Sequence, residues 1–196
     1  MSADSVTNAP LLDLRNYVQW FDAALPADFC AKMVDSFHQM QPFQTDNGRG
    51  HHSALDASAW VELNIQPHVD PAFMGFFYAQ IDRYLGEYNA RLPMSLPVPT
   101  RPLLEDLRIK RYRNDAEDRF QPHFDAGDKY ANRYMVFLWY LNDVAEGGET
   151  EFPDLGIRVQ ARAGRLLMFP PYWMFQHAGL KPRSNDKYIV STYMLF

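Results

Sequence analysis

Three side chains in the C-terminal half of the sequence are of the types that bind iron. His123 and Asp125 are separated by one residue, and His177 lies far downstream in the segment Gln-His-Ala-Gly. Alternate residues of a β-strand face the same way, so a strand would present His123 and Asp125 side by side. Two imidazoles and one carboxylate form the facial triad of non-haem Fe(II) sites, which leaves coordination positions open. Taken alone, a His-x-Asp pair or a single histidine is more often structural.

Lys187 is the residue that strengthens the metal hypothesis. It lies ten residues after His177 and begins the strongly β-forming segment Lys-Tyr-Ile-Val-Ser-Thr-Tyr-Met. The face of this strand that carries Lys187, Ile189 and Ser191 would point into a barrel. A lysine in an apolar core is costly unless an anion accompanies it, and the distal carboxylate of a bound dicarboxylic acid would be such an anion. The alternative is a solvated lysine at the end of a strand.

Several further segments occur in a fixed order around these residues. They are Tyr112, Gln-Pro-His-Phe-Asp at 121–125, Tyr-Leu-Asn-Asp-Val-Ala-Glu-Gly-Gly-Glu-Thr-Glu-Phe-Pro at 140–153, Gly-Arg-Leu-Leu-Met-Phe at 164–169, His-Ala-Gly at 177–179 and Lys-Tyr at 187–188. With them, the region from Arg108 to Phe196 resembles the prolyl 4-hydroxylase-like branch of the 2-oxoglutarate/Fe(II) dioxygenases. The resemblance covers nearly half of the chain.

The resemblance implies a set of site residues. His123, Asp125 and His177 would bind Fe(II), and Lys187 would form a salt bridge with the far carboxylate of 2-oxoglutarate. No other catalytic residue is expected beyond these ligands.

Two tyrosines are weaker candidates for binding the cosubstrate. Tyr112 matches a tyrosine that lies near 2-oxoglutarate in the family, although its spacing to the His-x-Asp motif is slightly longer here. Tyr140 resembles another hydrogen-bond donor to the cosubstrate, and a role as a core tyrosine is the alternative.

The implied reaction is the hydroxylation of a C–H bond with Fe(II), 2-oxoglutarate and O₂, releasing succinate and CO₂. Ascorbate is a candidate reductant. Analogy alone places the C–H bond in a prolyl residue of a peptide or protein. Related iron halogenases carry a small residue in place of the aspartate, so the presence of Asp125 disfavours halogenation.

Three other functions remain open. One is hydroxylation of a free amino acid or other small metabolite, which a closed pocket with an extra arginine would favour, whereas an open groove would favour a peptide. Another is a non-catalytic metal-binding jelly-roll module, which the presence of all three ligands and Lys187 disfavours. The last is a zinc hydrolase, which Lys187 and the lack of an evident general base disfavour.

The pattern of the whole chain indicates an α+β, mainly β fold with a double-stranded β-helix, that is, a cupin-like jelly roll with N-terminal helices packed on one sheet. Helical spacing of apolar residues predicts helices at 26–40 and 71–91, and a proline-rich stretch at 92–102 follows them. We expect one domain over 1–196, with helical support and a lid loop in 1–102 and the catalytic β core in 103–196. The expected strands are at 104–113, 119–125, 133–142, 149–152, 157–160, 164–169, 174–179 and 187–195.

Three segments have open interpretations. The polar, glycine-bearing stretch 44–59 is expected to be a loop that covers the site entrance, or else an ordinary connection. The aromatic segment 170–175 would line the substrate side of the pocket or serve packing. A basic cluster alternates with apolar residues as on an exposed strand edge; its members are Arg108, Lys110, Arg111 and Arg113.

Composition excludes several classes of protein. The 196 residues are 47% hydrophobic and 15% aromatic, which suits one packed domain, and the net charge of −5 argues against a nucleic-acid partner. The single cysteine, Cys30, rules out an internal disulfide. The first eight residues do not resemble a secretory signal and no apolar run is long enough for a membrane span, so we expect a cytoplasmic protein. The sequence leaves the oligomeric state open, and we expect the remaining histidines not to be ligands: His38, His51, His52 and His68.

Overall fold

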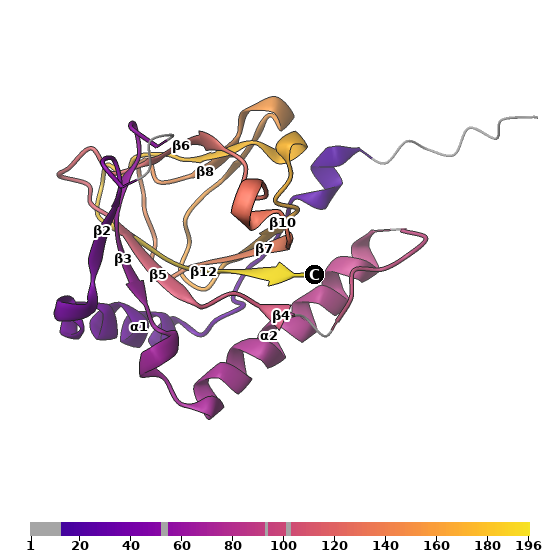
Figure 1. Ribbon diagram of the computed structural model, residues 1–196, viewed down its shortest axis with the longest axis horizontal. Coiled ribbons are helices and arrows are strands. Elements are labelled where there is room, and N and C mark those ends of the chain that lie inside the picture. Colours follow the sequence, from indigo (N-terminus) through magenta and orange to yellow (C-terminus); the bar gives the residue numbers. More distant parts are fainter. Residues whose placement is uncertain (1–12, 52–54, 93, 101–102) are drawn as a thin grey trace, which may run out of the picture.

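The computed structural model describes residues 13–51, 55–92, 94–100 and 103–196. Two antiparallel sheets face each other, and two helices cover the outer face of the larger sheet (Figure 1). This arrangement confirms the predicted jelly roll with helices on one sheet. Residues 1–12, 52–54, 93 and 101–102 lie outside the described residues. The expectations that His52 is not a ligand and that the first residues are not a signal concern these segments.

The larger sheet forms one side of the barrel. Its strand order is β1-β10-β7-β12-β5-β3-β2, and β4 pairs with β12 outside this path. The strands are β1 (Gln19–Phe21), β2 (Thr45–Gly48), β3 (Ala59–Asn64), β4 (Leu103–Leu104), β5 (Arg108–Tyr112), β7 (Arg133–Tyr140), β10 (Leu166–Phe169) and β12 (Lys187–Leu195).

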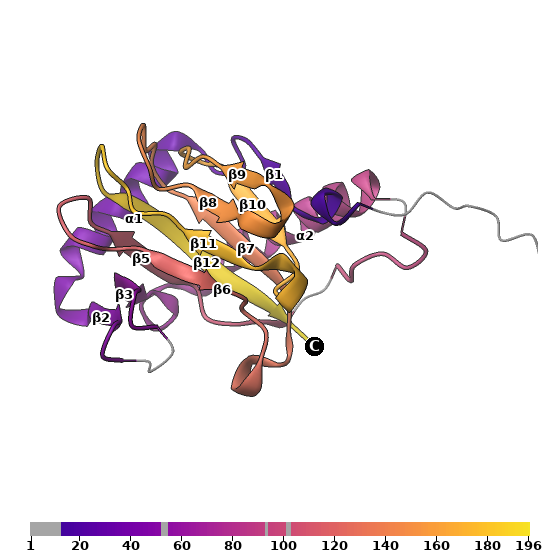
Figure 2. The same ribbon diagram turned by 90° about the horizontal axis from the view of Figure 1, so that it is seen from above.

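The smaller sheet closes the barrel from the opposite side (Figure 2). Its strand order is β6-β11-β8-β9, with β6 (Phe120–His123), β8 (Thr150–Phe152), β9 (Ile157–Val159) and β11 (His177–Gly179). The short 3₁₀ helices lie in the connections: Leu14–Tyr17, Gln41–Phe43, Gln66–His68, Asp128–Tyr130, Pro153–Leu155 and Trp173–Phe175.

The alternation of side chains on the larger sheet divides the core into two apolar clusters. On the outer face, Trp139 of β7 meets Phe77 with ring centroids 5.3 Å apart, and Tyr188 of β12 meets Phe37 at 5.7 Å. On the inner face, residues such as Leu138 belong to a second cluster between the sheets. Because adjacent strand residues face opposite ways, one strand supports both the helical layer and the interior of the barrel.

The two helices match their predicted positions closely. α1 (Ala27–Gln39) follows Pro26, and α2 (Pro71–Arg91) begins where the Asp70 carboxylate accepts a hydrogen bond of 2.8 Å from the Phe73 amide. Such an N-cap satisfies an amide that the helix leaves without a partner. Neither helix of the described segments combines the length and apolar character that crossing a membrane requires.

Two interpretations of the sequence were wrong. Segment 44–59 is not entirely loop, because β2 forms an antiparallel hairpin with β3 in which Thr45 pairs with Glu62. Since this hairpin adds strands beyond β5, the basic cluster does not lie on an exposed edge. β5 pairs with β12 on one side and β3 on the other, and its Lys110 is only 8% exposed.

Candidate metal centre

The two histidines face each other across neighbouring strands of the smaller sheet. His123 ends β6 and His177 begins β11, and the antiparallel register pairs them directly. Asp125 lies two residues beyond the end of β6, because this strand ends at His123 and not at Asp125 as expected. Its position is fixed by the backbone, because the amides of Asp125 and Ala126 both donate to the carbonyl oxygen of Pro171 at 3.0 Å.

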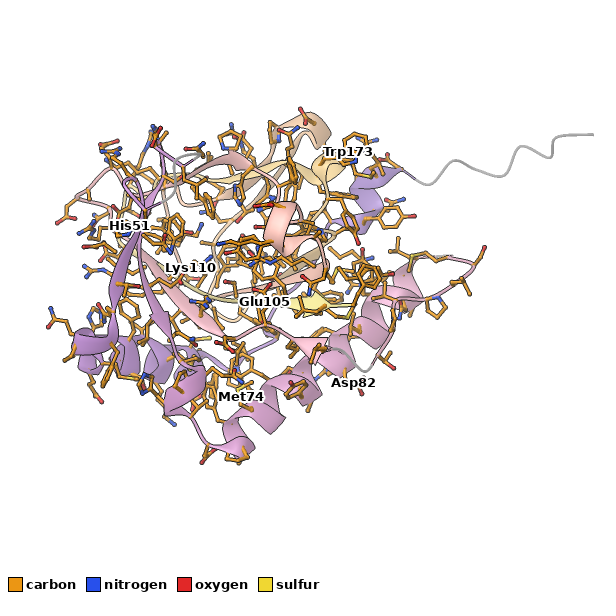
Figure 3. All side chains as sticks on the ribbon, in the orientation of Figure 1. His51, Met74, Asp82, Glu105, Lys110 and Trp173 are labelled. Carbon is orange, nitrogen blue, oxygen red and sulfur yellow. The ribbon has the colours of Figure 1, made fainter. Side chains whose placement is uncertain are left out.

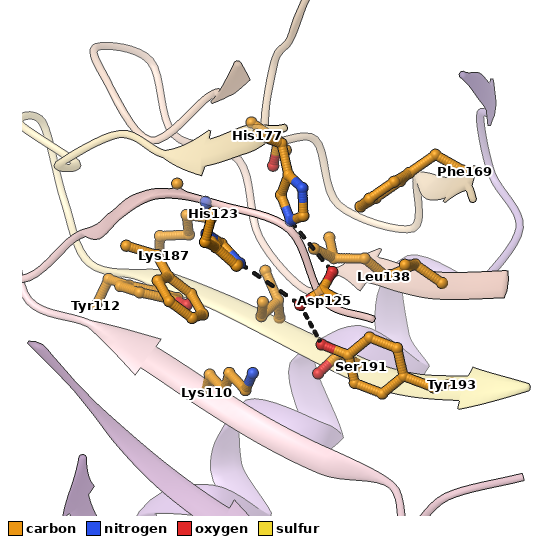
Figure 4. Close-up of a pocket in the computed structure, with 15 residues that line it drawn as sticks. Lys110, Tyr112, His123, Asp125, Leu138, Phe169, His177, Lys187, Ser191 and Tyr193 are labelled. Atoms are coloured by element: carbon orange, nitrogen blue, oxygen red, sulfur yellow. Dashed lines mark hydrogen bonds and ion pairs between the residues drawn. The ribbon is translucent and has the colours of Figure 1, made fainter. Parts of the chain in front are cut away.

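These three side chains converge on one point, as the sequence predicts (Figure 4). The Nε2 atoms of His123 and His177 lie 3.5 and 3.3 Å from the two carboxylate oxygens of Asp125, and one ligand atom of each residue lies within 4.8 Å of the others. No other group of three such residues in the described ranges could hold a metal. His38 and His68 contact Tyr188 and Phe43 instead, and His51 is exposed.

The backbone fixes the tautomer of both histidines. Nδ1 of His123 lies 2.8 Å from the carbonyl of Gln121, and Nδ1 of His177 lies 3.1 Å from the carbonyl of Phe175. A carbonyl only accepts, so Nδ1 carries the proton and Nε2 of the neutral ring presents a lone pair. Two lone pairs and a carboxylate facing one another repel unless a cation lies between them. The donor set therefore fits a divalent ion such as Fe(II).

Electrostatic interactions favour an ionised Asp125 and a neutral His177. Burial opposes ionisation of the Asp125 carboxyl, but His177, His123 and Arg133 outweigh it and hold the pKa below its usual range. Burial and His123 lower the pKa of His177 to about 4, so this ring is neutral near pH 7. Tyr193 of β12 donates a hydrogen bond of 3.0 Å to one carboxylate oxygen of Asp125. Hydrogen bonds of this kind orient a metal ligand.

Lys187 lies in the same cavity as the three candidate ligands. It is 2% exposed, it lines the cavity together with His123, Asp125 and His177, and no carboxylate of the described residues lies within ion-pair distance of its ammonium group. Burial lowers the pKa of Lys187 to about 7, because desolvation disfavours the charged form. The cavity thus holds a buried amine that an incoming carboxylate would complement.

The two tyrosines have different surroundings. Tyr112 lines the cavity, its ring centre is 5.1 Å from the Lys187 ammonium, and burial raises the pKa of its hydroxyl. The hydroxyl of Tyr140 donates to Thr150 Oγ1 at 2.7 Å, and it is Thr150 that lines the cavity. A contact of Tyr140 with the cosubstrate remains a prediction.

Sequence reasoning missed two residues of the site, Tyr193 and Lys110. Tyr193 could have been found, because it lies six residues after Lys187 and therefore on the same face of β12. Segment 170–175 contributes to packing and backbone contacts: Phe175 is in the interior cluster, and the Pro171 carbonyl holds Asp125. Trp173, at the rim of the molecule in Figure 3, is 67% exposed.

Comparison with known families agrees with this geometry. The model of the 2OG-Fe(II) oxygenase superfamily matches residues 107–195, which include His123, Asp125, His177 and Lys187. Residues 107–195 therefore resemble the domain of the 2OG-Fe(II) oxygenase superfamily.

Individual proteins similar to this chain are named prolyl 4-hydroxylases. The probable prolyl 4-hydroxylase 11 of Arabidopsis thaliana is 32% identical over 88 residues, 41% of this chain and 29% of that protein. The chain spans less than a third of the length of the curated relatives it matches.

Solved structures share the fold of this chain. The viral collagen prolyl hydroxylase of Paramecium Bursaria Chlorella virus-1, in its 2OG complex, aligns with a TM-score of 0.62 at 19% identity, over 91% of this chain and 95% of that one. The Trichoplax adhaerens prolyl hydroxylase in complex with a hypoxia inducible factor peptide aligns with a TM-score of 0.70 at 14% identity, over 92% and 84%.

Proposed function

We propose that this chain is a 2-oxoglutarate- and Fe(II)-dependent dioxygenase that hydroxylates a C–H bond of its substrate and releases succinate and CO₂. One observation carries the proposal: His123, Asp125 and His177 share a cavity with the buried ammonium of Lys187. A zinc hydrolase or a metal-binding module would account for the three ligands. Neither would account for a buried lysine that lacks an anion.

Each side chain has a definite task under this proposal. His123, Asp125 and His177 would hold Fe(II), which supplies the redox chemistry that activates O₂. Lys187 would hold the far carboxylate of 2-oxoglutarate and so fix its orientation in the cavity. The cavity wall is otherwise mainly apolar and keeps water from the reacting atoms; it includes Phe120, Val136, Leu138, Phe169 and Ile189.

For the substrate, we propose first a prolyl residue of a peptide or protein. This choice is supported by the relatives, which are named prolyl 4-hydroxylases, and by the peptide bound to the Trichoplax adhaerens structure. Ascorbate, as the reductant that keeps iron ferrous, belongs to the same proposal.

The test is to supply the purified chain with Fe(II), 2-oxoglutarate and O₂, and to measure succinate. Proline-rich peptides and free amino acids are included, and mass spectrometry detects the gain of one oxygen atom. We expect succinate formation that needs O₂ and a hydroxylated product. Asp125→Ala should reduce both to background because it removes a metal ligand, whereas His68→Ala, on the outer surface, should retain them.

Each alternative function predicts a different result. Metal binding without consumption of 2-oxoglutarate would favour the non-catalytic module. Substrate cleavage that proceeds without O₂ would favour the hydrolase.

A further inference from the structure

A second cavity adjoins the metal centre on the side of Asp125. It has a volume of about 370 Å³, within the roughly 300 to 1,000 Å³ of typical ligand pockets. It shares part of its wall with the cavity that holds the candidate ligands, so a molecule in it would lie next to the metal. The shared residues are Lys110, Phe120, Asp125 and Tyr193.

The β2–β3 hairpin forms part of the wall of this second cavity. Asn47 of β2, Leu55 of the loop and Trp60 of β3 all line it. Apart from residues 52–54, segment 44–59 thus contributes to the wall of this cavity, and the expectation that it covers the site entrance stays a prediction. The cavity is therefore where the substrate of the proposed oxygenase would bind.

Lys110 is the unusual residue of this wall. It extends from β5 towards the space below Asp125 (Figure 4). Its ammonium group is 5.4 Å from the ring centre of Trp60 and 5.8 Å from that of Phe120. No carboxylate of the described segments lies within 4.0 Å of it.

The nearby carboxylates are already engaged. Glu62, the cross-strand neighbour of Lys110, receives hydrogen bonds from Arg108 at 2.8 Å and from the Trp60 indole at 3.1 Å. Glu105 pairs with Arg133 through two contacts of 2.7 and 2.8 Å.

Asp125, the remaining carboxylate of the wall, would be shared between the metal and Tyr193. Each acid in the cavity thus has a closer hydrogen-bond partner than Lys110, whose buried ammonium group is attracted by Glu62 and Asp125 without contacting either carboxylate directly.

Burying an ammonium group without an anion in direct contact is costly, and an anion supplied by a ligand reduces that cost. Resting on the proposed function, we propose that Lys110 binds a carboxylate of the substrate and thereby positions the C–H bond at the metal. The carboxylate belongs either to a small free acid, such as an amino acid, or to an acidic side chain in a peptide. Aromatic walls from Trp60 and Tyr130 would hold the apolar part of either.

The test compares acids with their neutral partners. The chain, loaded with Fe(II) and 2-oxoglutarate, is offered L-amino acids including proline, the corresponding amides, and proline peptides with aspartate or asparagine beside the proline. Hydroxylated product and its KM are measured for the wild type, Lys110→Met and Lys110→Arg. Lys32→Met on the exposed face of α1 is the matched control.

We expect the wild type to prefer the acid in each pair. Lys110→Met should raise the KM for the acid by roughly 10- to 100-fold, the value of one hydrogen bond to a charged group, and should remove the preference. Lys110→Arg, which keeps the charge, should retain part of it, and Lys32→Met should retain all of it. Activity on the free acids or on the aspartate peptides identifies the source of the carboxylate.

The dissociation constant for 2-oxoglutarate separates this role from binding of the cosubstrate. It should be the same in Lys110→Met as in the wild type, which also shows that the variant is folded. A rise in this constant would assign Lys110 to 2-oxoglutarate and overturn the inference. Equal use of acids and amides, or failure to hydroxylate any acid while 2-oxoglutarate is consumed, would also overturn it. If no 2-oxoglutarate is consumed at all, the proposed function itself fails.

Discussion

At the scale of the residue, the centre is organised by hydrogen bonds that leave the metal-facing atoms free. Both histidines give their Nδ1 protons to main-chain carbonyls, and Asp125 accepts from Tyr193. Such contacts orient ligands before a metal arrives, and removing one typically weakens metal binding by about 10- to 100-fold. The three candidate ligands are thereby positioned to bind a cation, and Lys187, in the same cavity, is positioned to bind the carboxylate of an acid.

The burial of Lys187 leads to a prediction about how binding of 2-oxoglutarate depends on pH. In the absence of a ligand its pKa is about 7, well below that of a solvated lysine, because the amine is buried. Between about pH 7 and about pH 10.4, the Lys187 amine is neutral in the folded chain and protonated in the unfolded chain. The contribution of Lys187 to the free energy of unfolding therefore increases with pH in this range. A bound carboxylate favours the charged amine, so binding of 2-oxoglutarate above pH 7 must take up a proton.

The affinity for 2-oxoglutarate should therefore fall as the pH rises above about 7, by up to about 10-fold per unit. Calorimetric titrations from about pH 6 to about pH 9 measure it. Lys187→Arg is the control, since arginine stays charged throughout this range and the variant should show no such slope. An affinity of the wild type that does not change with pH would contradict the assignment of Lys187.

At the scale of the element, β12 links the two ends of the site. Its inward face carries Lys187, Ile189, Ser191 and Tyr193 along one side of the cavity. Period-two alternation predicts this face from the sequence, and the strand itself was predicted with its observed bounds. Lys110 could not be placed in the same way, because its environment depends on β3. That strand is short, follows a polar segment, and pairs with β5 across a long stretch of chain.

Gly164 provides an element-scale prediction. It precedes β10 with φ of +77°, and a Cβ atom there would lie 2.3 Å from the carbonyl oxygen of Leu25, just before α1. In Gly164→Ala, backbone strain should lower the free energy of unfolding by about 1 to 3 kcal/mol, and the clash with Leu25 should lower it further. Urea unfolding measures the change.

Gly86 on α2 is the matched control, because nothing lies within 4 Å of a Cβ added there. Gly86→Ala should raise stability by roughly 0.5 to 1 kcal/mol, as expected for a glycine inside a helix. A loss at Gly86 as large as that at Gly164 would contradict the account of the turn.

At the scale of the whole molecule, the site exists only where the two sheets meet. His123 and His177 come from the smaller sheet, whereas Lys187 and Tyr193 come from the larger one. The helices pack on the outer face of the larger sheet and so support the site without entering it. The sequence predicted this layering because each strand alternates and each helix has an apolar face. The pairing of β3 with β5, which creates the second cavity, could not be predicted from the sequence.

The most direct test of the account is a titration of the purified chain with Fe(II) under anaerobic conditions, followed by calorimetry. We expect one ion per chain for the wild type and for His68→Ala. His123→Ala and His177→Ala should each lose more than about 100-fold in affinity, since removing a ligand should cost at least as much as removing a residue that orients one. Unchanged binding in either ligand variant would contradict the claim that these side chains hold one cation.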